Sequence, residues 1–210
     1  MSYGFMDIAG TESVRAAQAA NGSDAYWSEF KGDRRSDRFT GAEAQFIAER
    51  DSFYIATVSE SGWPYIQHRG GPPGFLRPID DRTLAFADYR GNRQYISLGN
   101  LTADNRASLI LMDYPARRRL KIYAHVEARS LEDNPGLAEA LATPGYRAKP
   151  ERALLLHLDA FDCNCPQHIT PRFTERELAE ALTPMRFRLE QLEAENKALR
   201  EKIAAQPDGL

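Results

Sequence analysis

Apolar and polar residues alternate through the middle of the chain, which predicts β-strands that are buried on one face. The period of two is clearest in five segments, residues 52–59, 83–88, 106–113, 118–129 and 152–161. In the fourth segment one face carries only apolar residues, namely Leu120, Ile122, Ala124 and Val126. With residues 62–68 the pattern gives about six strands joined by short turns, a spacing that favours a small antiparallel barrel.

Helical patterns flank and interrupt these strands. Thr40 and Glu43 have the spacing of a capping box, and Phe46 and Ile47 give the helix that follows an apolar face up to Arg50. Further helices are expected over residues 13–20, 92–100 and 135–142. The sequence therefore predicts a mainly β fold with flanking helices.

The pattern becomes helical again from Thr174. Thr174 and Glu177 repeat the capping-box spacing, and Thr183-Pro184 predicts a second helix start, since proline suits the first helical position. A heptad repeat follows, with these residues at its a and d positions: Leu182, Met185, Leu189, Leu192, Asn196, Leu199 and Ile203.

The charges beside this repeat are complementary. In a parallel pair of helices Arg188 would face Glu193, and Glu195 would face Arg200, so the pattern predicts a parallel two-stranded coiled coil. The alternative is an amphipathic helix packed on its own barrel. We divide the chain into an N-terminal arm (residues 1–40), a barrel domain (41–173) and a C-terminal helical extension (174–206).

Composition places the chain among soluble globular proteins. Its 210 residues are 42% hydrophobic and 27% charged, with a mean hydropathy of −0.53. No apolar run approaches the roughly 20 residues that span a bilayer, and residues 1–10 lack the pattern of a signal peptide. The two cysteines, Cys163 and Cys165, suit a reducing compartment. We therefore expect a cytoplasmic protein without a membrane partner.

The net charge of −3 argues against a general nucleic-acid binder. The charge is unevenly spread, because residues 82–121 carry eight basic and three acidic side chains, a local charge of +5. Such a region suits a small anionic ligand held at one place, and the alternative is a solvated cationic face.

Two segments suggest a ligand site. Residues 67–74 place polar side chains at the end of a strand that runs into a Gly/Pro loop open to close approach of a ligand, although the loop lacks the Gly-Lys-Ser/Thr of a nucleotide triphosphatase. Residues 88–93 join a strand end, a glycine turn and a helix predicted to begin at Asn92. Backbone N–H groups there, with Arg93 beside them, would suit phosphate. The alternative for residues 67–74 is an ordinary turn between strands, and the alternative for residues 88–93 is a helix cap with solvated arginines.

A third segment holds Cys163, Cys165 and His168, which with His157 could form a soft metal site. Two thiolates one residue apart are a weak metal motif, and we predict no metal. His68 and His125 are interpreted as structural rather than catalytic.

The combination of segments resembles one family. Tyr54-Ile55-Ala56-Thr57-Val58, Gly62-Trp63-Pro64, residues 67–74, residues 88–93 with 97–101, and the strand end at 161–169 are similar to the pyridoxamine 5'-phosphate oxidase-related proteins, the FMN-binding split-barrel family. The resemblance covers residues 40–173 and is to the predicted flavin-nucleotide-binding branch rather than to the oxidase itself. It implies a split β-barrel with FMN as cofactor. It also implies a homodimer in which both chains contact each flavin.

The resemblance also implies site residues. Gln67 stands where the oxidase has an arginine for FMN, and Arg69 would supply that charge instead. Asn92 and Arg93 match the basic pair that grips the phosphate. The predicted cofactor-binding residues are Gln67, His68, Arg69, Asp88, Tyr89, Asn92, Arg93, Ser97, Asn100, Asn164 and Gln167, the last two as hydrogen-bond partners of the flavin ring. The first motif's later lysine falls near Pro72 and is missing, as is the C-terminal tryptophan and arginine pattern, which argues against the oxidase reaction.

We therefore predict an FMN-binding oxidoreductase or flavin reductase that acts on a small substrate, with no catalytic residue assigned. The flavin would supply the chemistry, and the protein would bind and orient it. One alternative is a relative that uses a deazaflavin or handles haem on the same barrel. Another is a non-catalytic flavin-binding or redox-sensing module whose zipper recruits a partner.

Overall fold

The structure is a computed structural model that describes residues 4–28, 37–164 and 166–204. Parts of the predicted N-terminal arm (1–3 and 29–36), Cys165 and the end of the chain from 205 lie outside the described residues, as does the side chain of Asn164. The chain divides into two compact units, Met1–Ile169 and Thr170–Leu210.

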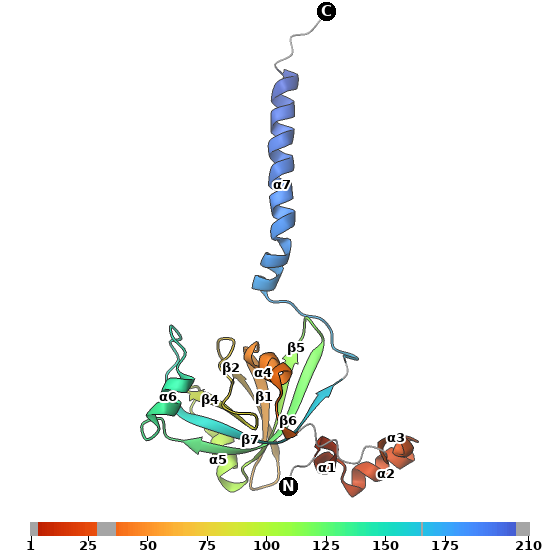
Figure 1. Cartoon of the computed structure of the whole chain (residues 1–210), viewed down its shortest axis with the longest axis vertical. Helices are drawn as coiled ribbons and strands as arrows, with labels where there is room; N and C mark the ends of the chain where they lie inside the picture. Colours follow the sequence, from red (N-terminus) through yellow and green to blue (C-terminus); the bar gives the residue numbers. More distant parts are fainter. Residues whose placement is uncertain (1–3, 29–36, 165, 205–210) are drawn as a thin grey trace, which may run out of the picture. The chain divides into compact units, whose positions relative to one another are not determined.

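The first unit is built on one antiparallel sheet of seven strands (Figure 1). The strands are β1 (Ser52–Val58), β2 (Pro64–Gly70), β3 (Arg77–Pro78), β4 (Thr83–Tyr89), β5 (Arg106–Asp113), β6 (Arg118–Arg129) and β7 (Pro150–Asn164). Their order in the sheet is β2-β1-β5-β6-β7-β4-β3. The predicted mainly β fold is confirmed. The alternation does not predict β3, since two residues show no period.

The described part of this unit contains six helices: α1 (Phe5–Ala9), α2 (Glu12–Ala20), α3 (Asp24–Ser28), α4 (Gly41–Ala48), α5 (Ile96–Ala103) and α6 (Pro135–Leu141). The capping box predicted at the start of α4 is confirmed. The Thr40 hydroxyl oxygen accepts from the Ala42 N–H at 3.3 Å, and the Glu43 carboxylate accepts from the Thr40 N–H at 2.9 Å. The helix buries Phe46 and Ile47 in the core, as its apolar face predicts.

Helix α5 begins four residues later than the sequence suggests. The Asn92 side-chain oxygen accepts from the Gln94 N–H at 3.1 Å, which closes a local turn. Arg93 and Tyr95 have φ angles of 63° and 53°, and left-handed residues cannot continue a right-handed helix. The prediction of a helix over 92–100 is therefore wrong at its start, and α5 runs from Ile96 to Ala103.

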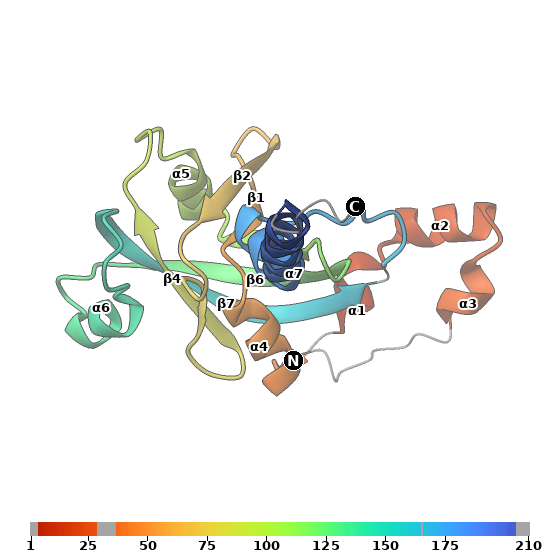
Figure 2. The ribbon, with the colours of Figure 1, turned by 90° about the horizontal axis from the view of Figure 1, so that it is seen from above.

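The strand alternation sorts side chains between two apolar clusters. Strand β4 is buried on both faces, because Leu84 and Phe86 join the main core while Ala85 and Ala87 join a second cluster with Leu141 of α6. Figure 2 shows α6 beside β4 and α5 beside β2. Two residues beyond Phe86, the strand period directs Asp88 to the same side as the main core.

The two ends of the sheet approach each other. Strand β2 forms one edge and β4 lies next to the other edge, yet Arg69 of β2 and Asp88 of β4 form an ion pair at 2.6 Å. The sheet therefore curls until β2 approaches β4, and we call this line of approach the seam. None of the described backbone hydrogen bonds joins β2 to β4.

The second unit consists of α7 (Glu175–Ala204) and the segment before it. The predicted capping box is confirmed, since Thr174 and Glu177 exchange backbone and side-chain hydrogen bonds at 2.8 and 3.2 Å. The predicted second helix start at Thr183-Pro184 is wrong, because α7 continues through Pro184. A proline there removes one hydrogen bond of the helix, and the rest of the helix persists. Among the described residues no helix is long and apolar enough to cross a membrane.

Candidate functional site

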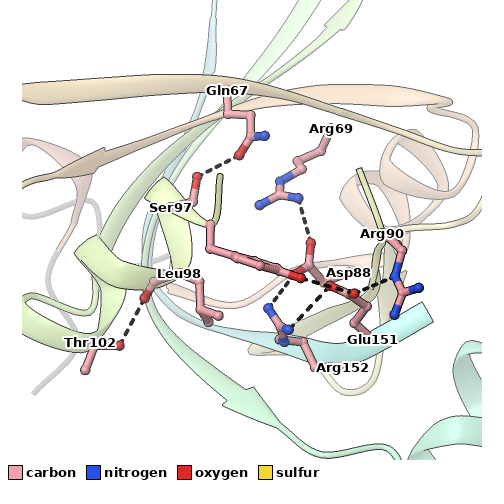
Figure 3. A network of polar contacts seen from close by, with 10 residues as sticks. Gln67, Arg69, Asp88, Arg90, Ser97, Leu98, Thr102, Glu151 and Arg152 are labelled. Atoms are coloured by element: carbon pink, nitrogen blue, oxygen red, sulfur yellow. Dashed lines mark hydrogen bonds and ion pairs between the residues drawn. The ribbon is translucent and has the colours of Figure 1, made fainter. Parts of the chain in front are cut away.

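A polar cavity of about 240 Å³ lies at the seam, beside the start of α5 (Figure 3). Strands β2, β4 and β7, the turn before α5 and the first turn of α5 all contribute to its wall. Its lining residues are Gln67, Arg69, Asp88, Tyr89, Gly91, Asn92, Arg93, Tyr95, Ser97, Leu98 and Glu151. Seven of the eleven predicted cofactor-binding residues therefore meet here.

The period of β2 decides which of its residues reach the cavity. Gln67 and Arg69 lie two positions apart, share the inner face and are half-buried. His68 lies between them on the opposite face, exposed, with its ring 5.4 Å from that of Tyr54. The structure thus places His68 away from the cavity, contrary to its place among the predicted residues.

A buried carboxylate organises the wall. Asp88 is 8% exposed, accepts from Arg69 Nη1 at 2.6 Å and faces Arg152 Nη1 at 3.3 Å. The three side chains point toward one another from β2, β4 and β7 (Figure 3). The register between β4 and β7 pairs Asp88 directly with Arg152. Because a buried charge is costly without a partner, these contacts hold both guanidinium groups at the seam.

A second carboxylate fixes the outer part of the wall. Glu151 accepts from Arg90 Nε at 2.8 Å and from the Tyr95 hydroxyl at 3.3 Å. The hydrogen bond from Arg90 is the main cause that lowers the pKa of the Glu151 carboxyl below its usual value, so Glu151 stays ionised at neutral pH. The guanidinium of Arg152 lies over the ring of Tyr95, 5.3 Å from its centroid. Tyr95 is thereby held in its left-handed conformation at the helix start.

Several donors at this cavity remain available to an anion. Arg69 Nε is buried and has no hydrogen-bond partner in the described structure. Arg93 is exposed, and the hydrogen bonds and ion pairs found among the described residues do not include its side chain. No described side chain caps α5, so the N–H groups of its first turn, at Ile96 to Leu98, are open. Two arginines and an uncapped helix N-terminus are donors of the kind that suits a phosphate group.

These residues fit the phosphate end of FMN and not the whole molecule. The unpartnered nitrogen of Arg69, the Arg93 guanidinium and the open helix start supply donors. The Ser97 hydroxyl donates to Gln67 Oε1 at 2.8 Å and would lie beside the same group. A volume of about 240 Å³ is below the roughly 300–1,000 Å³ typical of pockets that enclose a small ligand. The ring system would therefore lie outside this cavity.

Besides His68, three further predicted residues do not line the cavity. Asn100 lies on the buried face of α5, and its amide nitrogen donates to the Thr57 hydroxyl oxygen at 3.0 Å, which anchors the helix to β1. Gln167 is exposed in the turn that follows β7. The backbone of Asn164 ends β7, and its side chain lies outside the described structure. A role for Asn164 and Gln167 toward the flavin ring stays a prediction.

The cysteine segment presents a protonated thiol. Burial, and then the nearby Glu43 carboxylate, raise the pKa of Cys163 to about 11. Metal ligation requires a thiolate, so this environment disfavours it. The described residues contain no group of three or more metal-ligating side chains, and Cys165 lies outside them.

The basic middle of the sequence does not gather at one site. Of the eight basic residues between 82 and 121, only Arg93 lines the cavity. Five pair with carboxylates at separate places, namely Arg82, Arg90, Arg106, Arg118 and Lys121. Three of the partner carboxylates, Asp37, Glu151 and Asp162, lie outside residues 82–121, so pairing with them offsets part of the local charge of +5.

The sequence reasoning missed several residues of the site. Glu151 and Arg152 lie at the start of β7, more than sixty positions from Asp88, and only the pairing of β4 with β7 brings them together. Tyr95 was hidden inside the helix predicted from Asn92. The available signal was the clustering of arginines and carboxylates in residues 88–93 and 150–152. That clustering does not indicate which strands pair in the sheet.

Comparisons with known proteins identify related folds. The sequence profile of the family described as "Pyridoxamine 5'-phosphate oxidase" matches residues 39–156, more than half of the chain. The structure is similar to an FMN-binding protein from Syntrophomonas wolfei (17% identity, TM-score 0.46, covering 70% of this chain and 97% of that one). It is also similar to HupZ from Group A Streptococcus (14%, 0.45, 64% and 100%) and to an F420 reductase (19%, 0.40, 59% and 98%). No curated protein sequence matches.

Proposed function

The chain belongs to the pyridoxamine 5'-phosphate oxidase family, and we propose that it binds FMN, with the phosphate group in the cavity at the seam. The observation that carries the proposal is the buried Arg69 Nε, which lacks a partner and lies in the same wall as Arg93 and the open start of α5. A phosphate dianion would give that nitrogen the acceptor it lacks.

Each residue of the cavity has a distinct part in this proposal. Arg93 and the first-turn N–H groups of α5 bind the phosphate oxygens. Asp88 is a positioning residue, because it orients Arg69 through one oxygen and Arg152 through the other. Glu151 holds Arg90 and Tyr95, which shapes the turn that carries Arg93. Ser97 donates to Gln67, and this pair would form the wall of the cavity beside the bound group.

We propose that the bound flavin makes the protein an oxidoreductase or flavin reductase for a small substrate. Flavins transfer hydride or single electrons, and the protein's part is to bind and orient the ring and to exclude competing reactions. A cavity too small for the whole cofactor supports a homodimer in which a second chain covers the ring. Cofactor binding would then be linked to dimerisation, so FMN would tighten the dimer in sedimentation experiments.

Calorimetric titration of the apoprotein with FMN and with riboflavin tests the phosphate assignment. Arg93→Ala is expected to weaken FMN binding about 30-fold, or about 2 kcal/mol, the scale of a charge-assisted hydrogen bond, and to leave riboflavin binding unchanged. Arg117→Ala is the matched control. Arg117 is also an exposed arginine with a positive φ, 54°, but it lies in the turn between β5 and β6.

Two outcomes would contradict the assignment. Equal affinity for FMN and riboflavin would mean that the phosphate group does not bind in the cavity. Equal losses of FMN affinity in the Arg93 and Arg117 variants would mean that only the overall charge of the protein matters.

Turnover is tested separately, by the loss of absorbance near ~450 nm when reduced nicotinamide is added to the FMN-loaded protein. Tight binding without this loss would favour the non-catalytic flavin-binding module.

A further inference from the structure

Helix α7 is long and carries an apolar stripe that is open to solvent. It has 30 residues, about 45 Å at 1.5 Å per residue, and none of them is buried. The large apolar side chains of the stripe are 39–70% exposed: Leu178, Leu182, Met185, Leu189, Leu192, Leu199 and Ile203. Helices of soluble proteins are stabilised mainly by packing of such a face, so this stripe requires a partner.

The partner has to match the spacing of the stripe. The apolar residues recur every 3.5 positions, and the continuous helix adds Leu178 as a further d position before Leu182. Pro184 occupies a c position, away from the stripe, so a bend or a lost hydrogen bond there does not interrupt it. A repeat of 3.5 fits a helix of the same repeat, supercoiled against it.

We propose that α7 pairs with α7 of a second copy of this chain, as a parallel, in-register, two-stranded coiled coil. The flanking charges support this occupant. In that arrangement Arg188 faces Glu193 of the second copy, and Glu195 faces Arg200, so every charged g–e pair is attractive. This inference does not depend on the proposed flavin function.

Antiparallel pairing is the alternative that the sequence has to exclude. The antiparallel register that overlaps all of the stripe also keeps opposite charges together, with Arg188 facing Glu195. Charge therefore does not decide the direction. That register places Asn196 opposite Met185, where the buried amide has only a thioether beside it. A slip of one heptad brings Asn196 opposite a leucine and sets Glu193 against Glu193.

Asn196 decides the direction. In the parallel register the two copies of Asn196 lie in the same layer and can hydrogen-bond to each other. An asparagine at an a position lowers stability but selects two parallel strands in one register, because every other arrangement leaves its amide unpaired. The single polar residue of the stripe is therefore interpreted as the residue that aligns two copies of α7.

Distance measurement between spin labels tests the proposal on the full chain. A nitroxide is attached to Glu201→Cys, at an outward f position, in a background of Cys163→Ser and Cys165→Ser. In the parallel pair the two labels lie at the same level, and a narrow distribution within about 3 nm is expected. In the fully overlapped antiparallel pair residue 201 lies level with residue 180 of the second copy. The 21 intervening residues then separate the labels by about 32 Å along the axis alone.

Two variants that each add one carboxylate to α7 distinguish a disrupted apolar stripe from a general effect of added charge. Leu192→Glu places like charges at a d layer and is expected to abolish the short distance. Ala194→Glu adds the same carboxylate at an outward f position and is expected to keep it. Near-ultraviolet circular dichroism checks that the first unit stays folded, because all tyrosines and tryptophans lie before residue 170.

Each contrary result overturns the proposal. A distance near that of the antiparallel pair means that Asn196 does not set the direction. A broad distribution or none means that a second α7 does not cover the stripe. Loss of the short distance in Ala194→Glu as well as in Leu192→Glu means that charge rather than the stripe holds the copies. FMN titration of the same samples reports separately on the cavity, so failure of either proposal is recognised independently.

Discussion

Substitution of Asp88 by asparagine tests whether the ion pairs at the seam hold the first unit together. Asparagine keeps the shape of the side chain and removes its charge, so Arg69 and Arg152 would face each other without a carboxylate between them. Removing one partner of a buried ion pair costs about 3–5 kcal/mol. Arg69 and Arg152 are 16% and 20% exposed, and Arg152 keeps a contact with Glu151 at 3.5 Å. Water and Glu151 compensate part of the loss, and we expect a destabilisation of about 2–3 kcal/mol.

Urea unfolding of the full chain measures this free energy. The transition is followed by near-ultraviolet circular dichroism, which reports on the first unit, and no cofactor is added. For a chain of this size the expected loss corresponds to a fall in Tm of about 5–10 °C. Asp104→Asn is the control, because Asp104 and Arg106 form an ion pair whose side chains are 30% and 74% exposed. An exposed pair contributes at most about 1 kcal/mol.

The test compares how much each variant lowers the free energy of unfolding. A loss below about 0.5 kcal/mol for Asp88→Asn, or a loss equal to that of the control, would refute the reasoning. The first unit would then be held by apolar contacts in its core, such as that between Phe53 of β1 and Phe86 of β4, whose rings are 5.3 Å apart.

Two further predictions concern the loop after β2 and the end of β7. Gly71→Ala would bring a Cβ within 2.7 Å of the buried Phe75 ring, and we expect urea unfolding to show a loss of about 1–3 kcal/mol in the free energy of unfolding. Gly99→Ala in α5 is the control, because its Cβ meets open space and should leave this free energy unchanged or raise it. Cys163 is exposed, but partial desolvation and the Glu43 carboxylate raise its pKa to about 11. Its alkylation by iodoacetamide in Cys165→Ser should therefore rise with pH and reach half its maximum near pH 11, and a midpoint near 9 would mean that these surroundings do not perturb the thiol.

The strands could be predicted because their alternation was strong. Along β6 every second residue from Leu120 to Val126 is at most 5% exposed, as the period of two requires. The same rule excludes His68 from the cavity, since it lies between Gln67 and Arg69 on one strand. His68 is adjacent in sequence to two residues that line the cavity, but the strand period, not this adjacency, decides which side chains reach it.

The start of α5 and the pairing of strands could not be predicted. The side chain of Asn92 closes a turn, and Tyr95 adopts a left-handed conformation with Arg152 over its ring, so tertiary contacts and local hydrogen bonds displaced the helix start. Helix propensity does not contain these interactions. Likewise, nothing local to Asp88 indicates that β7 lies beside it. The contribution of β7 to the cavity therefore depends on the topology of the sheet.

The seam has a consequence for how a molecule reaches the cavity. Everywhere else around the sheet, two strands can part only if a ladder of backbone hydrogen bonds breaks. Along the seam the described contacts are side-chain ones, and the Arg69–Asp88 and Gln67–Ser97 pairs are those nearest the cavity. Local opening costs least where fewest backbone hydrogen bonds are lost. We therefore expect the seam to open more readily than any other part of the sheet, and a phosphate bound by Arg69, as proposed above, would oppose that opening.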